Sequence, residues 1–90
     1  MKDYDLLTAS QCIMYENASE FRCIDIDNDI WQQKINNSWQ NADSDLVKNT
    51  MINKVYDNMD AFKQKLSGSE YKKKFYTELN HWFYHNGYSR

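Results

Sequence analysis

Three residues near the C-terminus have the types and the spacing of metal ligands. Glu78, His81 and His85 are three and four positions apart, which places them on one flank of a helix. Two imidazoles and one carboxylate can supply three ligands to zinc. The chain holds only these two histidines, however, and a di-iron bundle would need a second Glu-x-x-His unit. We therefore interpret the three residues as a polar margin beside an apolar stripe and predict no bound metal.

An acidic segment begins like a calcium-binding loop. Asp25, Asp27 and Asp29 fill the first, third and fifth positions, where such a loop carries oxygen ligands. The sixth position, which normally needs glycine for a sharp turn, is Ile30, and the twelfth, normally a bidentate glutamate, is Asn36. We interpret this segment as the solvated acidic start of a helix.

Nucleophilic catalysis would require a serine, cysteine or lysine beside a general base. Cys12 and Cys23 lie in apolar surroundings, and no local signature joins them to the histidines of the last helix. The chain has two glycines, Gly68 and Gly87, too few for a glycine-rich phosphate loop. We predict a protein without catalytic residues or a cofactor, which is not an enzyme.

The elements that position these residues are expected to be helices. The chain has no proline and two glycines, and its 90 residues are the length of one domain, which we place at 1–90. We predict an all-α fold, a small bundle with a C-terminal antiparallel helical hairpin, folding alone or as an obligate dimer. The four helices are expected near residues 8–19, 28–40, 44–66 and 69–86.

Between the first two predicted helices, residues 21–26 alternate in a way that fits a short strand. No partner strand is apparent elsewhere, so we interpret them as a connector that packs Phe21 and Ile24 inward. The helix over 28–40 is expected to carry Trp31 and Trp39 on one stripe.

The last two predicted helices have the clearest periodicity. Asp43 or Ser44 is expected to cap the third helix. Its apolar stripe is Val47, Met51, Val55, Met59, Phe62 and Leu66. The inner stripe of the last helix is Tyr71, Phe75, Leu79 and Trp82. We expect these two stripes to close against each other in the core.

Charge is unevenly distributed along the chain. Residues 1–60 hold five basic and eleven acidic side chains, a balance of −6, whereas residues 61–90 hold six basic and two acidic ones, a balance of +4. The N-terminus leads into no apolar stretch, so no secretory signal is expected, and no apolar run is long enough to cross a membrane. We predict a cytoplasmic protein in which Cys12 and Cys23 are thiols.

Two groups of residues are predicted to contact a partner. The first belongs to the last helix and its end, where tyrosine is a favoured interface anchor and lysine supplies charge: Tyr84, Tyr88, Phe83, Tyr76, Lys72 and Lys73. The second consists of carboxylates that could face a basic protein groove: Asp25, Asp27 and Asp29, with Asp43 and Asp45.

From these features we predict a non-enzymatic binder that acts stoichiometrically on another protein. An inhibitor or neutraliser of the phage, plasmid or toxin-immunity kind is favoured, with acidic mimicry of a nucleic acid as one route. Two alternatives stay open. One is a nucleic-acid binder that uses Lys72 to Lys74 and the aromatic helix. The other is a homodimeric structural or adaptor protein.

Overall fold

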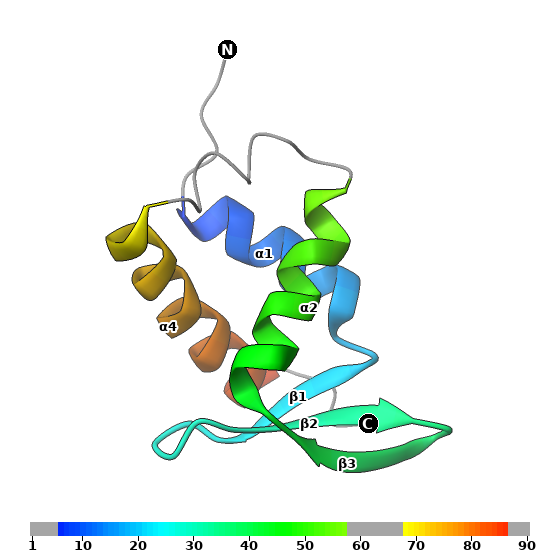
Figure 1. Ribbon diagram of the computed structural model, residues 1–90. Coiled ribbons are helices and arrows are strands. Elements are labelled where there is room, and N and C mark those ends of the chain that lie inside the picture. Colours follow the sequence, from blue (N-terminus) through cyan, green and yellow to red (C-terminus); the bar gives the residue numbers. More distant parts are fainter. Residues whose placement is uncertain (1–5, 58–67, 87–90) are drawn as a thin grey trace.

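The computed structural model describes residues 6–57 and 68–86. Three helices, α1 (Leu6–Asn17), α2 (Ser44–Tyr56) and α4 (Ser69–Asn86), lie on one side of a three-stranded sheet (Figure 1). The strands are β1 (Phe21–Asp25), β2 (Ile30–Ile35) and β3 (Ser38–Ala42), in the antiparallel order β1-β2-β3. The fold is therefore α+β. The prediction of an all-α four-helix bundle was wrong, because residues 21–42 form a three-stranded sheet.

The hairpin of β2 and β3 replaces the helix predicted over 28–40. Asn36 and Asn37, between the strands, both have positive φ, 52° and 65°. A two-residue turn of this kind matches the twist of paired strands, and asparagine tolerates the left-handed region better than most residues. The register places Trp31 opposite Ala42 and Lys34 opposite Trp39. The two tryptophans thus lie on opposite faces of the sheet, and the single indole stripe that we predicted does not exist.

Strand β1 pairs with β2, the partner strand that was not apparent from the sequence. Phe21 lies opposite Gln33 and Cys23 opposite Trp31, and the register then shifts between Cys23 and Asp25. Phe21 points into the core as predicted. Ile24 does not, because the alternation of a strand turns it to the other face, where it is exposed.

Two of the predicted helices have the expected starts. Asp43 caps α2, since its carboxylate accepts a hydrogen bond of 3.1 Å from the backbone N–H of Leu46. Helix α4 spans Ser69–Asn86, the predicted bounds. The predicted helix over 44–66 is described as far as Tyr56, and its Met59, Phe62 and Leu66 lie outside the described residues.

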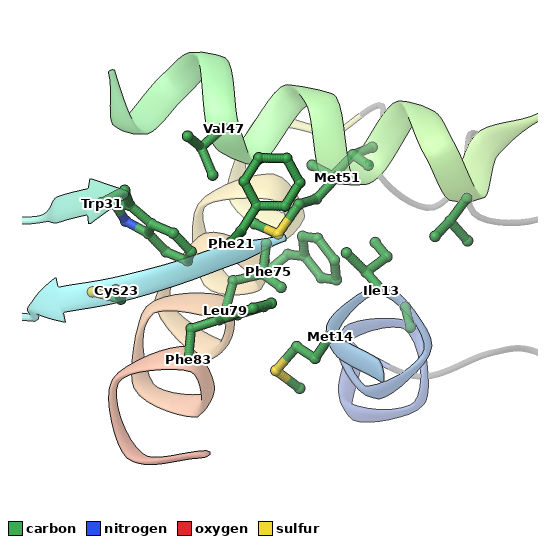
Figure 2. Packing of buried hydrophobic residues seen from close by; sticks show 13 residues of the cluster. Ile13, Met14, Phe21, Cys23, Trp31, Val47, Met51, Phe75, Leu79 and Phe83 are labelled. Carbon is green, nitrogen blue, oxygen red and sulfur yellow. The ribbon is translucent and has the colours of Figure 1, made fainter. Parts of the chain in front are cut away.

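Among the described residues, α1, α2, α4 and the first two strands contribute to one core (Figure 2). Its largest members are Trp31, Phe21, Phe75, Phe83, Ile13, Met14, Met51 and Leu79. Val47, Met51 and Val55 are buried on α2 as predicted. Helix α4 packs mainly on α1 and β1, however, rather than closing against α2 as a hairpin. In this packing Phe83 is buried, and Tyr71 and Trp82 lie at the margin of the core.

Candidate protein-binding surfaces

The loop between β1 and β2 holds the carboxylate of Asp25, the last residue of β1, in a fixed position. Asp25 accepts hydrogen bonds from the backbone N–H of Asp27 at 3.1 Å and of Asn28 at 3.2 Å, and from the Asn28 side chain at 2.9 Å. The side-chain and backbone hydrogen bonds from Asn28 lower the pKa of Asp25 below its usual value. The loop is a turn between strands, so the prediction of an acidic helix start was wrong.

Asp29 ends this loop and ties it to α2. Its φ is 54°, in the left-handed region. The carboxylate accepts hydrogen bonds from Trp31 Nε1 at 2.8 Å, from Ser44 Oγ at 2.9 Å and from Lys48 Nζ at 2.9 and 3.1 Å. The Lys48 side chain is 4% exposed and that of Asp29 is 39% exposed. A nearly buried ammonium is therefore neutralised by a carboxylate that reaches the surface.

The ionisation of Asp29 reflects two opposing effects. Burial raises the pKa of this carboxyl, but the hydrogen bonds from Lys48, Trp31 and Ser44 lower it by more. The pKa of Asp29 consequently lies below its usual value, and the group stays charged at neutral pH. Three partners within the molecule bind this carboxylate, so Asp29 positions the loop. Its contact with another protein stays a prediction.

The contact between Asp29 and Ser44 brings two acidic segments together. Asp25 ends β1 and Asp27 lies in the loop that follows, while Asp43 and Asp45 flank Ser44 at the start of α2. We call the four carboxylates, with the neighbouring Ile30 and Leu46, the acidic end. Ile30 pairs with Asp25 in the sheet, and the N–H of Leu46 donates to Asp43. Both aliphatic side chains are exposed, Leu46 by 60%.

The partner-contacting residues predicted on α4 differ in their exposure. Phe83 is 1% exposed, and its ring centroid lies 5.3 Å from that of Trp31, so its assignment to a surface was wrong. The periodicity of the helix, combined with its packing on β1, turns this position inward. Tyr84 is 45% exposed, as expected, and its ring packs edge-on against His85. Tyr88 lies outside the described residues.

In the middle of α4, the Tyr76 side chain reaches α2. The Tyr76 hydroxyl donates a hydrogen bond of 2.8 Å to Asn49 Oδ1, and burial raises the pKa of Tyr76. Lys72 is half-buried with its Nζ 5.8 Å from the centre of the Tyr76 ring, whereas Lys73 is exposed. Tyr76 and Lys72 are thus involved in packing within the molecule, and the run of lysines does not point in one direction.

The groups considered for chemistry are placed as follows. His81 and His85 are exposed on one flank of α4, with parallel rings 6.4 Å apart. Within residues 6–57 and 68–86, no group of three His, Cys, Asp or Glu side chains is arranged to hold a metal ion. Cys12 and Cys23 are free thiols. Burial raises the pKa of Cys23, which favours the protonated and non-nucleophilic form.

Two aromatic features of the surface were not predicted from the sequence. Tyr15 on α1 is 74% exposed and packs edge-on against Trp82, with ring centroids 5.6 Å apart. On the sheet face opposite the helices, the Arg22 guanidinium lies 4.3 Å from the centre of the Trp39 ring. The exposure of Tyr15 could have been predicted from helical periodicity, because Tyr15 lies on a different face of the helix from the buried Ile13 and Met14. The face on which Trp39 lies could be predicted only once the β2–β3 hairpin was known.

Comparison of the chain with family models, with curated proteins and with solved structures found no significant match. None of the helices among the described residues is both long and apolar enough to cross a bilayer.

Proposed function

We propose that the protein is a non-enzymatic binding module that acts stoichiometrically on another protein and contacts it through the acidic end. One observation supports this most directly. Carboxylates from two separate segments share one end of the sheet with the exposed side chains of Ile30 and Leu46. Protein interfaces combine apolar contact area with a polar rim, and both are found at the acidic end.

The acidic end is also organised before any partner arrives. Asp25 accepts hydrogen bonds from the loop that follows it, and Asp43 caps α2. The ion pair of Asp29 with Lys48 fixes the loop against the helix. Groups that are already ordered lose little conformational entropy on binding, which favours affinity.

The charge of the acidic end indicates the kind of partner. Four carboxylates attract a surface rich in lysine or arginine and accelerate its capture at low ionic strength. A basic groove that normally holds a nucleic acid is such a surface. An occupant of that groove would exclude the nucleic acid, so we favour an inhibitor or neutraliser within the wider class of binders.

The test compares two triple variants that remove the same charge from different places. The first is Asp27→Asn, Asp43→Asn and Asp45→Asn, in which asparagine at position 43 can still cap α2. The matched control is Glu16→Gln, Glu70→Gln and Glu78→Gln, three exposed helical positions away from the acidic end. Both proteins and the wild type are used for affinity capture from the native host, and the captured protein is then titrated against each.

We expect the wild type and the control to bind one basic protein with equal affinity and one-to-one stoichiometry. The acidic-end variant should bind it roughly ten- to a hundredfold more weakly, with a smaller dependence on salt. Equal loss in both variants, or no specific partner in repeated captures, would contradict the proposal. Salt-dependent binding of oligonucleotides that requires Lys73 and Lys74 would favour the nucleic-acid alternative instead.

A further inference from the structure

The two edges of the sheet differ in the features that prevent further strand pairing. Strand β1, at one edge, carries the charged Arg22 and Asp25 and an irregularity between Cys23 and Asp25. Strand β3, at the other edge, has the sequence Ser-Trp-Gln-Asn-Ala, with no charge and no proline, and its register with β2 is regular over all five residues. Charges, prolines and bulges are the usual protection of an edge strand, and β3 has none of them.

The helices leave β3 at the margin of the fold. Among the described elements, α4 packs on β1 and α2 packs on β2, and β3 makes its main contacts with β2 (Figure 1). Ser38, Gln40 and Asn41 are exposed. The strand is therefore held in extended conformation by β2 while much of its length remains at the surface.

The hairpin turn determines which backbone groups of β3 point outward. The two-residue turn makes Ile35 and Ser38 the first hydrogen-bonded pair, and such pairs alternate along an antiparallel ladder. Asn41, opposite Gln32, then belongs to a pair that is not hydrogen-bonded. Its N–H and C=O point away from β2, toward the edge of the sheet.

We propose that β3 pairs with β3 of a second copy of this chain, antiparallel and centred on Gln40. In this register Asn41 of each copy faces Trp39 of the other, and every residue of the strand has an opposite residue. The two Gln40 side chains lie directly opposite each other on the face that carries the helices. The result is a continuous six-stranded sheet with the helices of both copies on one side.

A second copy fits this edge better than a charged segment would. An uncharged strand pairs with itself without repulsion, since no like charges become opposite neighbours. Antiparallel pairing also sets the end of β3 that leads into Asp43 beside the end of the partner's sheet that carries Lys34. A five-residue strand buries less area than a standard interface, so the dissociation constant is expected at about micromolar or above.

The test exploits the pairing of Gln40 with itself. Gln40→Lys and Gln40→Glu each place two like charges opposite each other, and each should weaken the dimer by about tenfold. An equimolar mixture of the two variants places lysine opposite glutamate and should form a heterodimer at least as tight as the wild type. Gln11→Lys and Gln11→Glu, at an exposed position on α1, are the matched controls and should dimerise like the wild type. Sedimentation equilibrium from about 5 µM to 1 mM measures all of them.

A second pair of variants tests the backbone. Asn41→Pro removes the outward N–H and leaves the ladder with β2 intact, as proline is tolerated where an edge N–H faces outward. It should weaken the dimer by about tenfold, whereas Asn41→Ala, which loses the same side chain, should not. Circular dichroism checks that both variants fold. A wild type that stays monomeric at all concentrations, or a dimer that is insensitive to positions 40 and 41, would overturn the proposal.

Discussion

The two connections of the sheet both reverse the direction of the chain, but they are stabilised in different ways. Both join antiparallel strands and contain Asp or Asn residues at positive φ: Asp29 in the β1–β2 loop, and Asn36 and Asn37 in the β2–β3 turn. Asp29 is also bound to Lys48 on α2, whereas Asn36 and Asn37 are exposed. One connection therefore depends on a tertiary contact, and the other depends mainly on the conformational preferences of its own residues.

The largest expected effect comes from separating the ion pair of the first connection. Asp29→Asn keeps the side-chain shape and the tolerance of positive φ but leaves the Lys48 ammonium, 4% exposed, without its counter-charge. We expect the free energy of unfolding to fall by about 2–4 kcal/mol, somewhat less than for a fully buried pair, because water reaches Asp29. Urea-induced unfolding measures the loss.

Two controls sharpen this result. Lys48→Met leaves Asp29 partly hydrated and still hydrogen-bonded to Trp31 and Ser44, so it should cost less than Asp29→Asn. Asp27→Asn, in the exposed part of the same loop, should change stability by less than about 0.5 kcal/mol. If Asp27→Asn costs as much as Asp29→Asn, the loop is not anchored through Lys48.

The second connection should respond to backbone preference alone. Asn37→Ala places an ordinary residue at φ 65° and should cost about 1–2 kcal/mol. Asn37→Gly produces the Asn-Gly pair favoured in such turns and should leave stability unchanged or raise it slightly. Thermal unfolding of both variants measures this difference. Equal losses in the two variants would show that the asparagine side chain, and not its φ, is what matters.

The smallest expected effect is on the dependence of stability on pH. The pKa of Asp29 is lowered in the folded state, so its contribution to stability is complete above its unfolded pKa of about 3.9 and is lost as the pH falls through the folded value. The stability of the wild type should therefore fall more steeply on acidification than that of Asp29→Asn. Asp25, whose pKa is lowered by its bonds to Asn28, should remain as a source of acid sensitivity in that variant. Identical pH profiles would contradict the role of Asp29.

The prediction of secondary structure from sequence succeeded where the apolar residues follow one periodicity and failed where they fit both a helix and a strand. Over 69–86 the stripe of Tyr71, Phe75, Leu79 and Trp82 has helical spacing, and the predicted bounds of α4 were confirmed. Between 28 and 40 the same aromatic residues fit a helical stripe or two short strands, and the absence of proline and glycine favoured the helix. Asn36-Asn37 was the missing signal, because paired asparagines can supply the positive φ of a hairpin turn.

The candidate surfaces show the same limit. Tyr84 was correctly placed outside the core because its position on the helix is almost opposite the apolar stripe. Phe83 was misplaced because the direction in which α4 faces β1 is set by packing and not by the helix itself.

The sequence by itself determined the last helix, a cap of α2 at Asp43 or Ser44, the buried positions of Val47, Met51 and Val55, and the uneven charge. These are local properties, in which a residue acts on neighbours within one or two turns of the chain. Only the tertiary structure decided that residues 21–42 form a sheet, that Asp29 is bound to Lys48, and that the two acidic segments share one end. Those features join residues that are distant along the chain, and pairing of strands and burial of an ion pair become favourable only when the rest of the fold brings the partners together.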